Sequence, residues 1–313
     1  MSAHFGQEVD TPWTRLRKHM NLDRVVSAVA PGSGLAFAAV VATRSVAEMR
    51  CRHDSSPTAT AAMGRLLAAS ALFGISLAPH EWVTLRISGD GALGTFSADC
   101  RLLDDGTLGA RAYAADPLAE LPPNALGKAD VAGIVGSGTL HVTKSYAVGQ
   151  PYNGVVPLVT GEIAEDVAFY LANSEQIPSV VALGVLMGPE GVRAAGGVMA
   201  QVLPGADPAA VDRLEKRALA LSPPARSIAE GADAWAMLEL LAGDEPLRSK
   251  HELALRFACP CTLERVERAL LGLGEDTLAE MAASGESTEA FCDFCRERYL
   301  ISPSAIARLV GER

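Results

Sequence analysis

Four of the six cysteines in this 313-residue chain lie in two close pairs near the C-terminal end. Cys259 and Cys261 form a C-x-C pair, and Cys292 and Cys295 form a C-x-x-C pair after the intervening residues 262–291. Four thiolates in two close pairs are the ligands that a tetrahedral zinc ion prefers, with Zn–S bonds of about 2.3 Å. The pattern predicts one structural or regulatory zinc ion per chain, and the alternative is two unrelated pairs of buried thiols.

The segment around these cysteines, residues 256–313, predicts a small zinc-binding module. We expect a helix over 263–271, a second over 277–283, and a third that begins at Ser302-Pro303, where a serine cap precedes a proline. A segment of this size with few apolar residues needs a metal or disulfides to fold. Metal binding contributes on the order of 10–16 kcal/mol in small zinc peptides, and a domain has only about 5–15 kcal/mol of net stability. Losing the ion should therefore unfold the module.

The C-x-C spacing also suggests redox chemistry. A disulfide that spans one intervening residue is strained, and strained, exposed disulfides are easily reduced again. The cysteines therefore have two stable arrangements, which are thiolates on zinc or two disulfides with the metal expelled. Charged residues close to the cysteines in sequence have opposite effects on thiolate formation. The arginines that would favour the thiolate are Arg256, Arg265, Arg296 and Arg298. The acidic residues that would oppose it are Glu264, Asp293 and Glu297.

Residues 23–205 predict an α+β core domain with a mixed arrangement of sheet and helices. One helix starts at Ser56-Pro57 and another covers 161–173. Gly89-Asp90-Gly91 predicts the turn of a hairpin. The predicted strands cover 24–30, 35–43, 82–88, 95–100, 107–115, 139–145, 155–160, 180–187 and 192–202.

Residues 206–255 predict a helical linker between the core and the module, because they are rich in charge and divided by prolines. Short helices are not stable alone, so the linker should be metastable and should depend on docking against a neighbour. Trp235, Leu238 and Leu241 share one helical face, which is the predicted docking face. Residues 1–22 predict a loosely ordered N-terminal arm.

Taken in order, these features resemble the 33 kDa chaperonin (heat-shock protein 33) family, and the resemblance covers nearly the whole chain from Asp23. Both cysteine pairs match the family pattern. The other matching segments are Arg52–Ala59, Gly89–Gly91, Leu93-Gly94, Pro151–Gly154, Gly161–Asp166, Ser174–Gln176, Pro178-Ser179, Ala195–Gly197, Gln201 and Pro204–Ala206.

The resemblance implies a holdase, which is a chaperone that works without ATP and is not an enzyme. In the family picture the reduced, zinc-bound form is inactive. Oxidants such as hypochlorite, or peroxide with heat, form Cys259–Cys261 and Cys292–Cys295 disulfides, and zinc then leaves. The module and linker unfold, and the chaperone, usually a homodimer when oxidised, binds unfolding or oxidatively damaged client proteins.

Composition excludes several other classes of function. Hydrophobic residues make up 49% of the chain, so it can bury a large core. The formal net charge of −10 argues against binding to nucleic acid or to an anionic membrane. The N-terminus has no apolar signal segment, and the longest apolar run, Leu66–Pro79, is too short and polar to cross a bilayer. We therefore expect a cytoplasmic protein.

Two other functions compete with the holdase. A zinc ribbon could recognise nucleic acid or a protein partner, although no basic stripe with aromatic residues is present. A thiol–disulfide oxidoreductase could use the C-x-x-C pair, although no βαβ pattern surrounds it.

Several smaller features have structural explanations. Gly89–Gly94 satisfies G-x-G-x-x-G, but a strand follows it where a nucleotide-binding loop requires a helix. His53 and Asp54 precede a helix start, and capping is expected of them rather than catalysis. Cys51 and Cys100 are expected to be buried apolar residues, with a sensing thiol as the alternative.

Overall fold

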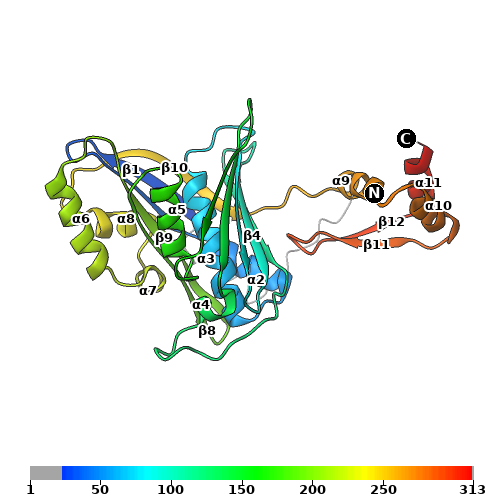
Figure 1. Ribbon diagram of the computed structural model, residues 1–313, viewed down its shortest axis with the longest axis horizontal. Coiled ribbons are helices and arrows are strands. Elements are labelled where there is room, and N and C mark those ends of the chain that lie inside the picture. The colour runs from blue at the N-terminus through cyan, green and yellow to red at the C-terminus, as the bar shows by residue number, and fades with distance from the viewer. Residues whose placement is uncertain (1–22, 312–313) are drawn as a thin grey trace, which may run out of the picture.

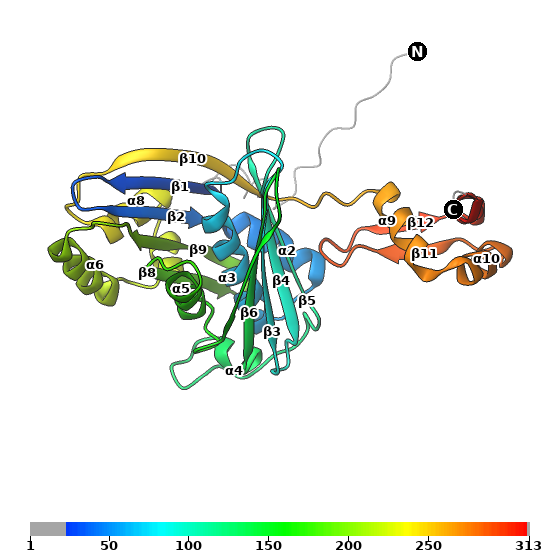
Figure 2. The same cartoon turned by 45° about the horizontal axis from the view of Figure 1, so that its top comes forward.

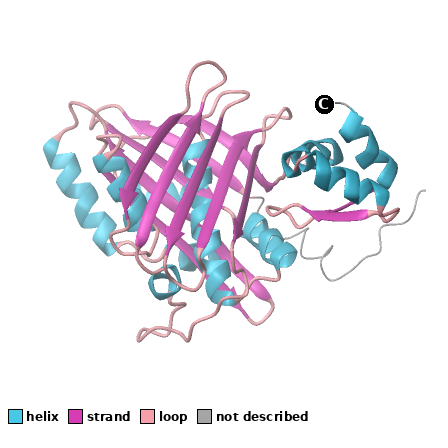
Figure 3. Cartoon of the chain, turned by 45° about the vertical axis from the view of Figure 1, so that its right-hand side comes forward, coloured by secondary structure: helices cyan, strands magenta, loops and turns pink. Residues whose placement is uncertain are grey.

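The computed structural model describes residues 23–311 (Figure 1). The N-terminal arm expected over residues 1–22 lies outside the described residues. Within 23–311 the strands form a ten-stranded sheet, in the order β7-β6-β3-β4-β5-β10-β1-β2-β9-β8, and a separate two-stranded sheet, β11-β12 (Figure 3). The mixed α+β fold expected from the sequence is therefore confirmed.

The large sheet and the helices around it come from residues 24–257. Its strands are β1 (Arg24–Ala30), β2 (Leu35–Val41), β3 (Trp82–Gly89), β4 (Thr95–Leu102), β5 (Leu108–Ala114), β6 (Gly138–Ser145), β7 (Tyr152–Pro157), β8 (Ser179–Gly188), β9 (Gly191–Val202) and β10 (Arg248–Phe257). Its helices are α2 (Thr43–His53), α3 (Pro57–Gly74), α4 (Val131–Val135), α5 (Ala164–Asn173), α6 (Pro208–Ala220), α7 (Pro224–Ala229) and α8 (Ala234–Ala242).

Strand β10 joins two halves of the large sheet. One half is β1-β2-β9-β8, and β10 pairs with β1 in antiparallel fashion over most of its length. The other half is β3 to β7, and β10 pairs with β5 in parallel through three residues, Leu255, Arg256 and Phe257. The strand that closes the sheet therefore ends directly before the first cysteine pair.

Helix α3 packs against both halves of the sheet and forms the centre of the core (Figure 2). Ser56 caps its first turn by accepting a hydrogen bond from the Ala59 N–H at 3.1 Å, and Pro57 occupies the first helical position. Most of its side chains are buried, because alanine and leucine on all sides fit between two apolar sheet faces. The helix start predicted at Ser56-Pro57 is confirmed.

Helices α6, α7 and α8 cover the opposite face of the β1-β2-β9-β8 half (Figures 1 and 2). From α8, Met237, Leu238 and Leu241 are fully buried against this face. The apolar residues of the sheet that these helices cover are Val26, Ala28, Ala30, Leu35, Phe37, Ala39, Val41, Val198 and Ala200. Removing the three helices would expose a continuous apolar surface.

The C-terminal module lies at one end of the molecule (Figures 1 and 2). It contains α9 (Leu263–Leu270), the 3₁₀ turn η1 (Leu271–Leu273), α10 (Glu275–Ala283), α11 (Pro303–Gly311) and the hairpin β11 (Thr288–Phe291) and β12 (Arg298–Ile301). Its buried apolar cluster consists of Leu278, Ile301, Ala305 and Ile306. So small a cluster is not enough to hold a domain together without a further constraint.

Parts of the core differ from the elements expected from the sequence, among them the short helix α4, which was not predicted. Residues 206–255 were expected to be helical, but Arg248–Phe257 is strand β10, because β1 and β5 offer backbone partners on both sides. Helix α2 was not predicted, because its capping residue, Ala42, has no polar side chain. Its first free N–H groups are satisfied instead by the Asp23 carboxylate, which accepts from Arg44 N at 3.0 Å and Ser45 N at 2.6 Å.

Candidate metal centre

The four cysteines of the two pairs converge on one point. The Sγ atoms of Cys259, Cys261, Cys292 and Cys295 all lie within 4.8 Å of one another. The Cys259 and Cys292 sulfurs are 3.7 Å apart, and those of Cys261 and Cys295 are 3.2 Å apart. A tetrahedron with metal–sulfur bonds of about 2.3 Å has sulfur–sulfur edges of roughly 3.8 Å. The cluster therefore has the donor set and approximate size of a site that could hold one thiophilic metal ion.

The first pair is positioned by the end of β10. Ala258 N donates to Ala110 O at 3.1 Å and so extends the pairing with β5 up to Cys259. Thr262 begins helix α9 by accepting from Arg265 N through its side chain at 3.3 Å. The Cys259-Pro260-Cys261 segment is thus held between a strand end and a helix start.

The second pair lies in the turn of the β11–β12 hairpin, whose tip faces the core (Figures 1 and 2). Arg296 N donates to Cys292 O at 2.7 Å, and Cys292 N donates to Glu297 O at 3.0 Å. This tight turn is closed by Arg296, which has a positive φ of 57°. The turn brings the sulfurs of Cys292 and Cys295 to the same side.

Two side chains outside the cysteine set donate hydrogen bonds to the first pair. Arg111 Nη1 donates to Cys259 Sγ at 3.0 Å, and the Tyr299 hydroxyl donates to Cys261 Sγ at 3.1 Å. Burial by itself would raise the pKa of Cys259, but the Cys261 backbone N–H and the Arg111 guanidinium outweigh it, so this pKa lies below its ordinary value. The Tyr299 pKa is raised, first by its hydrogen bond to Cys261.

The second pair lies in a different electrostatic environment. Burial raises the pKa of both Cys292 and Cys295, and Cys295 is only 4% exposed. A metal ion would reverse this effect, because coordination stabilises the thiolate form of both sulfurs. Contacts within the protein therefore favour ionisation of Cys259, whereas burial opposes ionisation of Cys292 and Cys295.

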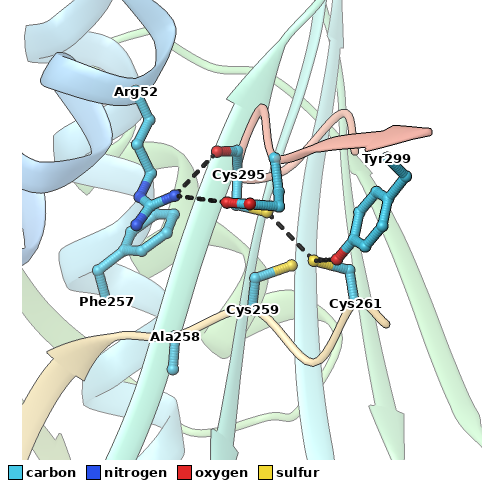
Figure 4. A pocket seen from close by; sticks show the side chains of 8 residues that line it. Arg52, Phe257, Ala258, Cys259, Cys261, Cys295 and Tyr299 are labelled. Carbon is cyan, nitrogen blue, oxygen red and sulfur yellow. Dashed lines mark hydrogen bonds and ion pairs between the residues drawn. The ribbon is translucent and has the colours of Figure 1, made fainter. Parts of the chain in front are cut away.

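A cavity of about 340 Å³ opens beside the cluster (Figure 4). Cys259, Cys261 and Cys295 line it together with Arg52 and Tyr299. The sulfurs therefore have an open side that a small molecule can approach.

The turn that carries the second pair also contacts the core. The Phe294 ring lies edge-on to Tyr113 with 4.5 Å between ring centroids, and His53 Nε2 donates to Phe294 O at 3.0 Å. Arg52 Nη1 donates to Cys295 O at 3.2 Å. Burial is the main cause of the lowered His53 pKa, so the ring is held as the neutral donor.

The linker face named from the sequence lies away from the cysteines. Leu238 and Leu241 of α8 are fully buried against the sheet. Trp235 is half-buried, and its Nε1 donates to Glu252 Oε2 at 2.9 Å. Of the two remaining cysteines, Cys100 is buried and Cys51 is exposed, so the burial expected of Cys51 is wrong.

The arginines that act on the cluster are not those nearest to it in sequence. The Arg256 side chain contacts Asp105 and Thr107, and that of Arg265 contacts Pro260 O. The Arg296 side chain lies over the Phe291 ring, and that of Arg298 pairs with Glu289. Sequence reasoning missed Arg111, Tyr299 and Arg52. Only the parallel register of β5 and β10, which the sequence does not reveal, brings Arg111 to Cys259.

The capping of helix α3 that was expected of His53 and Asp54 is made by Ser56 instead. His53 contacts the module, and Asp54 ends helix α2 in the left-handed conformation with a φ of 47°. No described helix is both long and apolar enough to span a membrane.

A mixed core joined to a four-cysteine module is the architecture of a known class of chaperone. Residues 23–302 match the profile of the family described as Hsp33 protein. The 33 kDa chaperonins of Picosynechococcus sp. and Nostoc punctiforme are each 42% identical to this chain, over 93% of it and over 97% and 96% of their own lengths. The crystal structure of the 33 kDa chaperonin from Thermotoga maritima superposes with a TM-score of 0.84 at 32% identity, over 93% of this chain and 99% of that one.

The chain belongs to the Hsp33 family, and the resemblance found in its sequence is confirmed. The family is named for a chaperone role, which is not an enzymatic one. Client proteins are the partners that such a role implies.

Proposed function

We propose that this protein is a redox-regulated holdase that works without ATP. The reduced form holds one zinc ion on Cys259, Cys261, Cys292 and Cys295 and is inactive. Oxidation converts the four thiolates to disulfides, the module and the linker over 206–255 unfold, and the apolar surface beneath the linker binds unfolding proteins. The working units are the core over 23–205, this linker, and the redox-switch module over 256–313.

One observation carries this proposal: the four sulfurs gather at the end of the strand that follows the covering helices. Helices α6 to α8 lead directly into β10, and β10 leads directly into Cys259. Unfolding around the cysteines would therefore loosen the last residues of β10, which pair with β5. Because β10 follows helices α6 to α8 directly, these helices would lose their anchor at one end and could leave the apolar sheet face that they cover. Exposed apolar surface of this kind is what a client-binding site requires.

The redox step uses two equivalents of a two-electron oxidant, such as hypochlorite or peroxide. Each oxidant molecule takes two electrons from two thiolates and leaves one S–S bond, so two disulfides consume all four ligands and none remains for the zinc ion. We propose the pairs Cys259–Cys261 and Cys292–Cys295. Both pairings are within reach, because all four sulfurs lie within 4.8 Å. Sequence neighbours stay close when the module unfolds, whereas partners from different pairs separate, which favours the within-pair bonds.

Zinc fits the site better than harder cations do. Four sulfur donors favour a thiophilic ion over magnesium or calcium, which prefer oxygen. When bound, zinc would hold the two ends of the module together and keep the sulfurs as thiolates.

The setting of this activity follows from the same proposal. The protein would act in the cytoplasm, where thiols are normally reduced, and would protect clients during oxidative and heat stress. The oxidised form would be a homodimer. The alternatives are a zinc ribbon that recognises nucleic acid or a partner, and a thiol–disulfide oxidoreductase.

Parallel assays on reduced and oxidised protein test the proposal. Reduced protein should contain one zinc per chain and should fail to suppress aggregation of a thermally unfolding client. After hypochlorite it should release zinc, form the two disulfides, which peptide mapping by mass spectrometry identifies, and suppress aggregation without nucleotide. A Cys51→Ser variant, which keeps the cluster, should behave like the wild type.

The outcomes separate the alternatives. Equal protection by reduced and oxidised protein would refute the switch. Zinc retained through oxidation would favour a structural ribbon. Catalytic reduction of insulin disulfides would favour the oxidoreductase.

A further inference from the structure

Arg111 of the core makes three contacts that together include both cysteine pairs. Its Nε and Nη2 donate to Asp99 Oδ2 at 3.0 and 2.6 Å. Its Nη1 donates to Cys259 Sγ at 3.0 Å. The centre of its guanidinium lies 3.6 Å from the centroid of the Phe294 ring, which belongs to the C-x-x-C turn.

Asp99 fixes the direction in which this guanidinium points. Asp99 is on β4, opposite Arg111 in the antiparallel register with β5, and its other oxygen accepts from Thr84 at 2.8 Å. The Arg111 and Asp99 side chains are only 14% and 10% exposed. Because Asp99 binds one edge of the planar guanidinium and the group is nearly buried, its Nη1 and its flat face keep fixed positions.

Arg111 contacts one residue from the segment of each cysteine pair. Cys259 reaches it from the end of β10, through the parallel pairing with β5. Phe294 reaches it from the hairpin turn and also packs on Tyr113 of the same strand. Arg111, which is held by Asp99, therefore contacts both the C-x-C segment, through Cys259, and the C-x-x-C turn, through Phe294.

We propose that Arg111 is a positioning residue for the metal centre, which aligns Cys259 with the C-x-x-C turn and couples metal binding to docking of the module on the core. This proposal rests on the proposed zinc site but goes beyond it, because it assigns part of the metal affinity to the core domain. Coupling of this kind is reciprocal, so a docked module binds metal more tightly and a loaded module docks more tightly.

Removing the guanidinium should weaken both properties. Losing a hydrogen-bond partner of a metal ligand typically lowers metal affinity by about 10–100-fold. Lysine should not replace arginine here, because it cannot chelate Asp99, donate to sulfur and stack on Phe294 at the same time. The matched control is Arg86 on strand β3, which β4 separates from β5; its side chain is exposed and makes no contact with the described residues of the module.

The first experiment measures zinc affinity of the reduced, full-length protein by competition with a chromophoric chelator. We expect Arg111→Gln to bind zinc about 10–100-fold more weakly than wild type, Arg111→Lys to remain weakened, and Arg86→Gln to match wild type. Thermal unfolding of each variant shows whether loss of the ion pair with Asp99 has weakened the core.

The second experiment leaves Arg111, Asp99 and all four sulfurs in place. Phe294→Leu removes the aromatic ring that packs on Arg111 and on Tyr113, so the zinc-loaded, reduced protein should become more sensitive to protease at the junction between core and module. Combining Arg111→Gln with Phe294→Leu should weaken zinc binding by less than the sum of the two single effects, since both changes remove the contact between Arg111 and Phe294.

The results distinguish failure of this inference from failure of the proposed function. Wild-type protein that binds zinc and is activated by oxidant, with Arg111→Gln and Phe294→Leu indistinguishable from it, would overturn the coupling alone. Strictly additive effects of the two substitutions would overturn it as well. Wild-type protein that binds no zinc would overturn both proposals.

Discussion

Replacing Leu238 with asparagine tests whether the covering helices keep the chaperone inactive. Leu238 is fully buried between α8 and the sheet face. On the same helix Leu240 is 52% exposed, so Leu240→Asn adds the same side chain without a buried site and is the matched control. Both substitutions change the intrinsic helix preference of α8 by the same amount.

The expected effect follows from burial. Truncating a buried leucine costs about 2–5 kcal/mol, and a buried amide without partners adds about 1–3 kcal/mol. Leu238→Asn should therefore weaken docking of α8 by at least about 3 kcal/mol, which raises the undocked fraction by at least roughly a hundredfold. A nine-residue helix such as α8 does not persist in water without its packing surface. Leu240→Asn should change stability by less than about 0.5 kcal/mol.

Two assays on the reduced, zinc-loaded proteins measure the effect. Limited proteolysis should cut Leu238→Asn within residues 206–255 faster than wild type, and client aggregation should be suppressed without oxidant. Leu240→Asn should be cut slowly and stay inactive. If Leu238→Asn is cut faster yet remains inactive, the face under α8 is not the client-binding surface. If neither variant is cut faster, the linker is not metastable.

Three further predictions concern the metal, one carboxylate and one helix cap. Chelating the metal from reduced protein should unfold the C-terminal module while the core keeps its melting temperature, as followed by circular dichroism, and serine at all four cysteines should make the protein active without oxidant. Burial raises the pKa of Asp23 to about 6 from 3.8, so its protonated form favours folding, and this stabilisation is lost as pH rises from 4 to 7; the unfolding free energy of wild type minus that of Asp23→Asn should fall by about 3 kcal/mol over that range. Ser56→Ala should lower the unfolding free energy by about 1 kcal/mol in urea titrations, through loss of the α3 cap, and an unchanged midpoint would contradict that role.

Local signals in the sequence predicted much of the fold. The cap at Ser56 and the turn at Gly89–Gly91 act over a few residues, and the structure has both where they were expected. The cysteine spacing likewise predicted that the four sulfurs could hold a metal ion, and the structure brings them together.

The parts that were missed depend on distant neighbours. Strand β10 has mostly exposed side chains and no strong strand pattern, and it is a strand because β1 and β5 accept it. Helix α2 is capped by Asp23 from outside the helix. Arg111 lies 148 residues before Cys259, and only the assembled sheet shows that it serves the cluster.

The join between β10 and β5 is only three residue pairs long, and it is the seam between the two halves of the sheet. If β10 left β5, helix α3 would still hold the two halves together, because it packs against strands of both. The backbone groups of β1 and β5 that pair with β10 would then stay in place. Once the thiols are reduced and metal returns, the strand has a ready place to pair again, so recovery would need only re-insertion of one segment and not refolding of the whole chain.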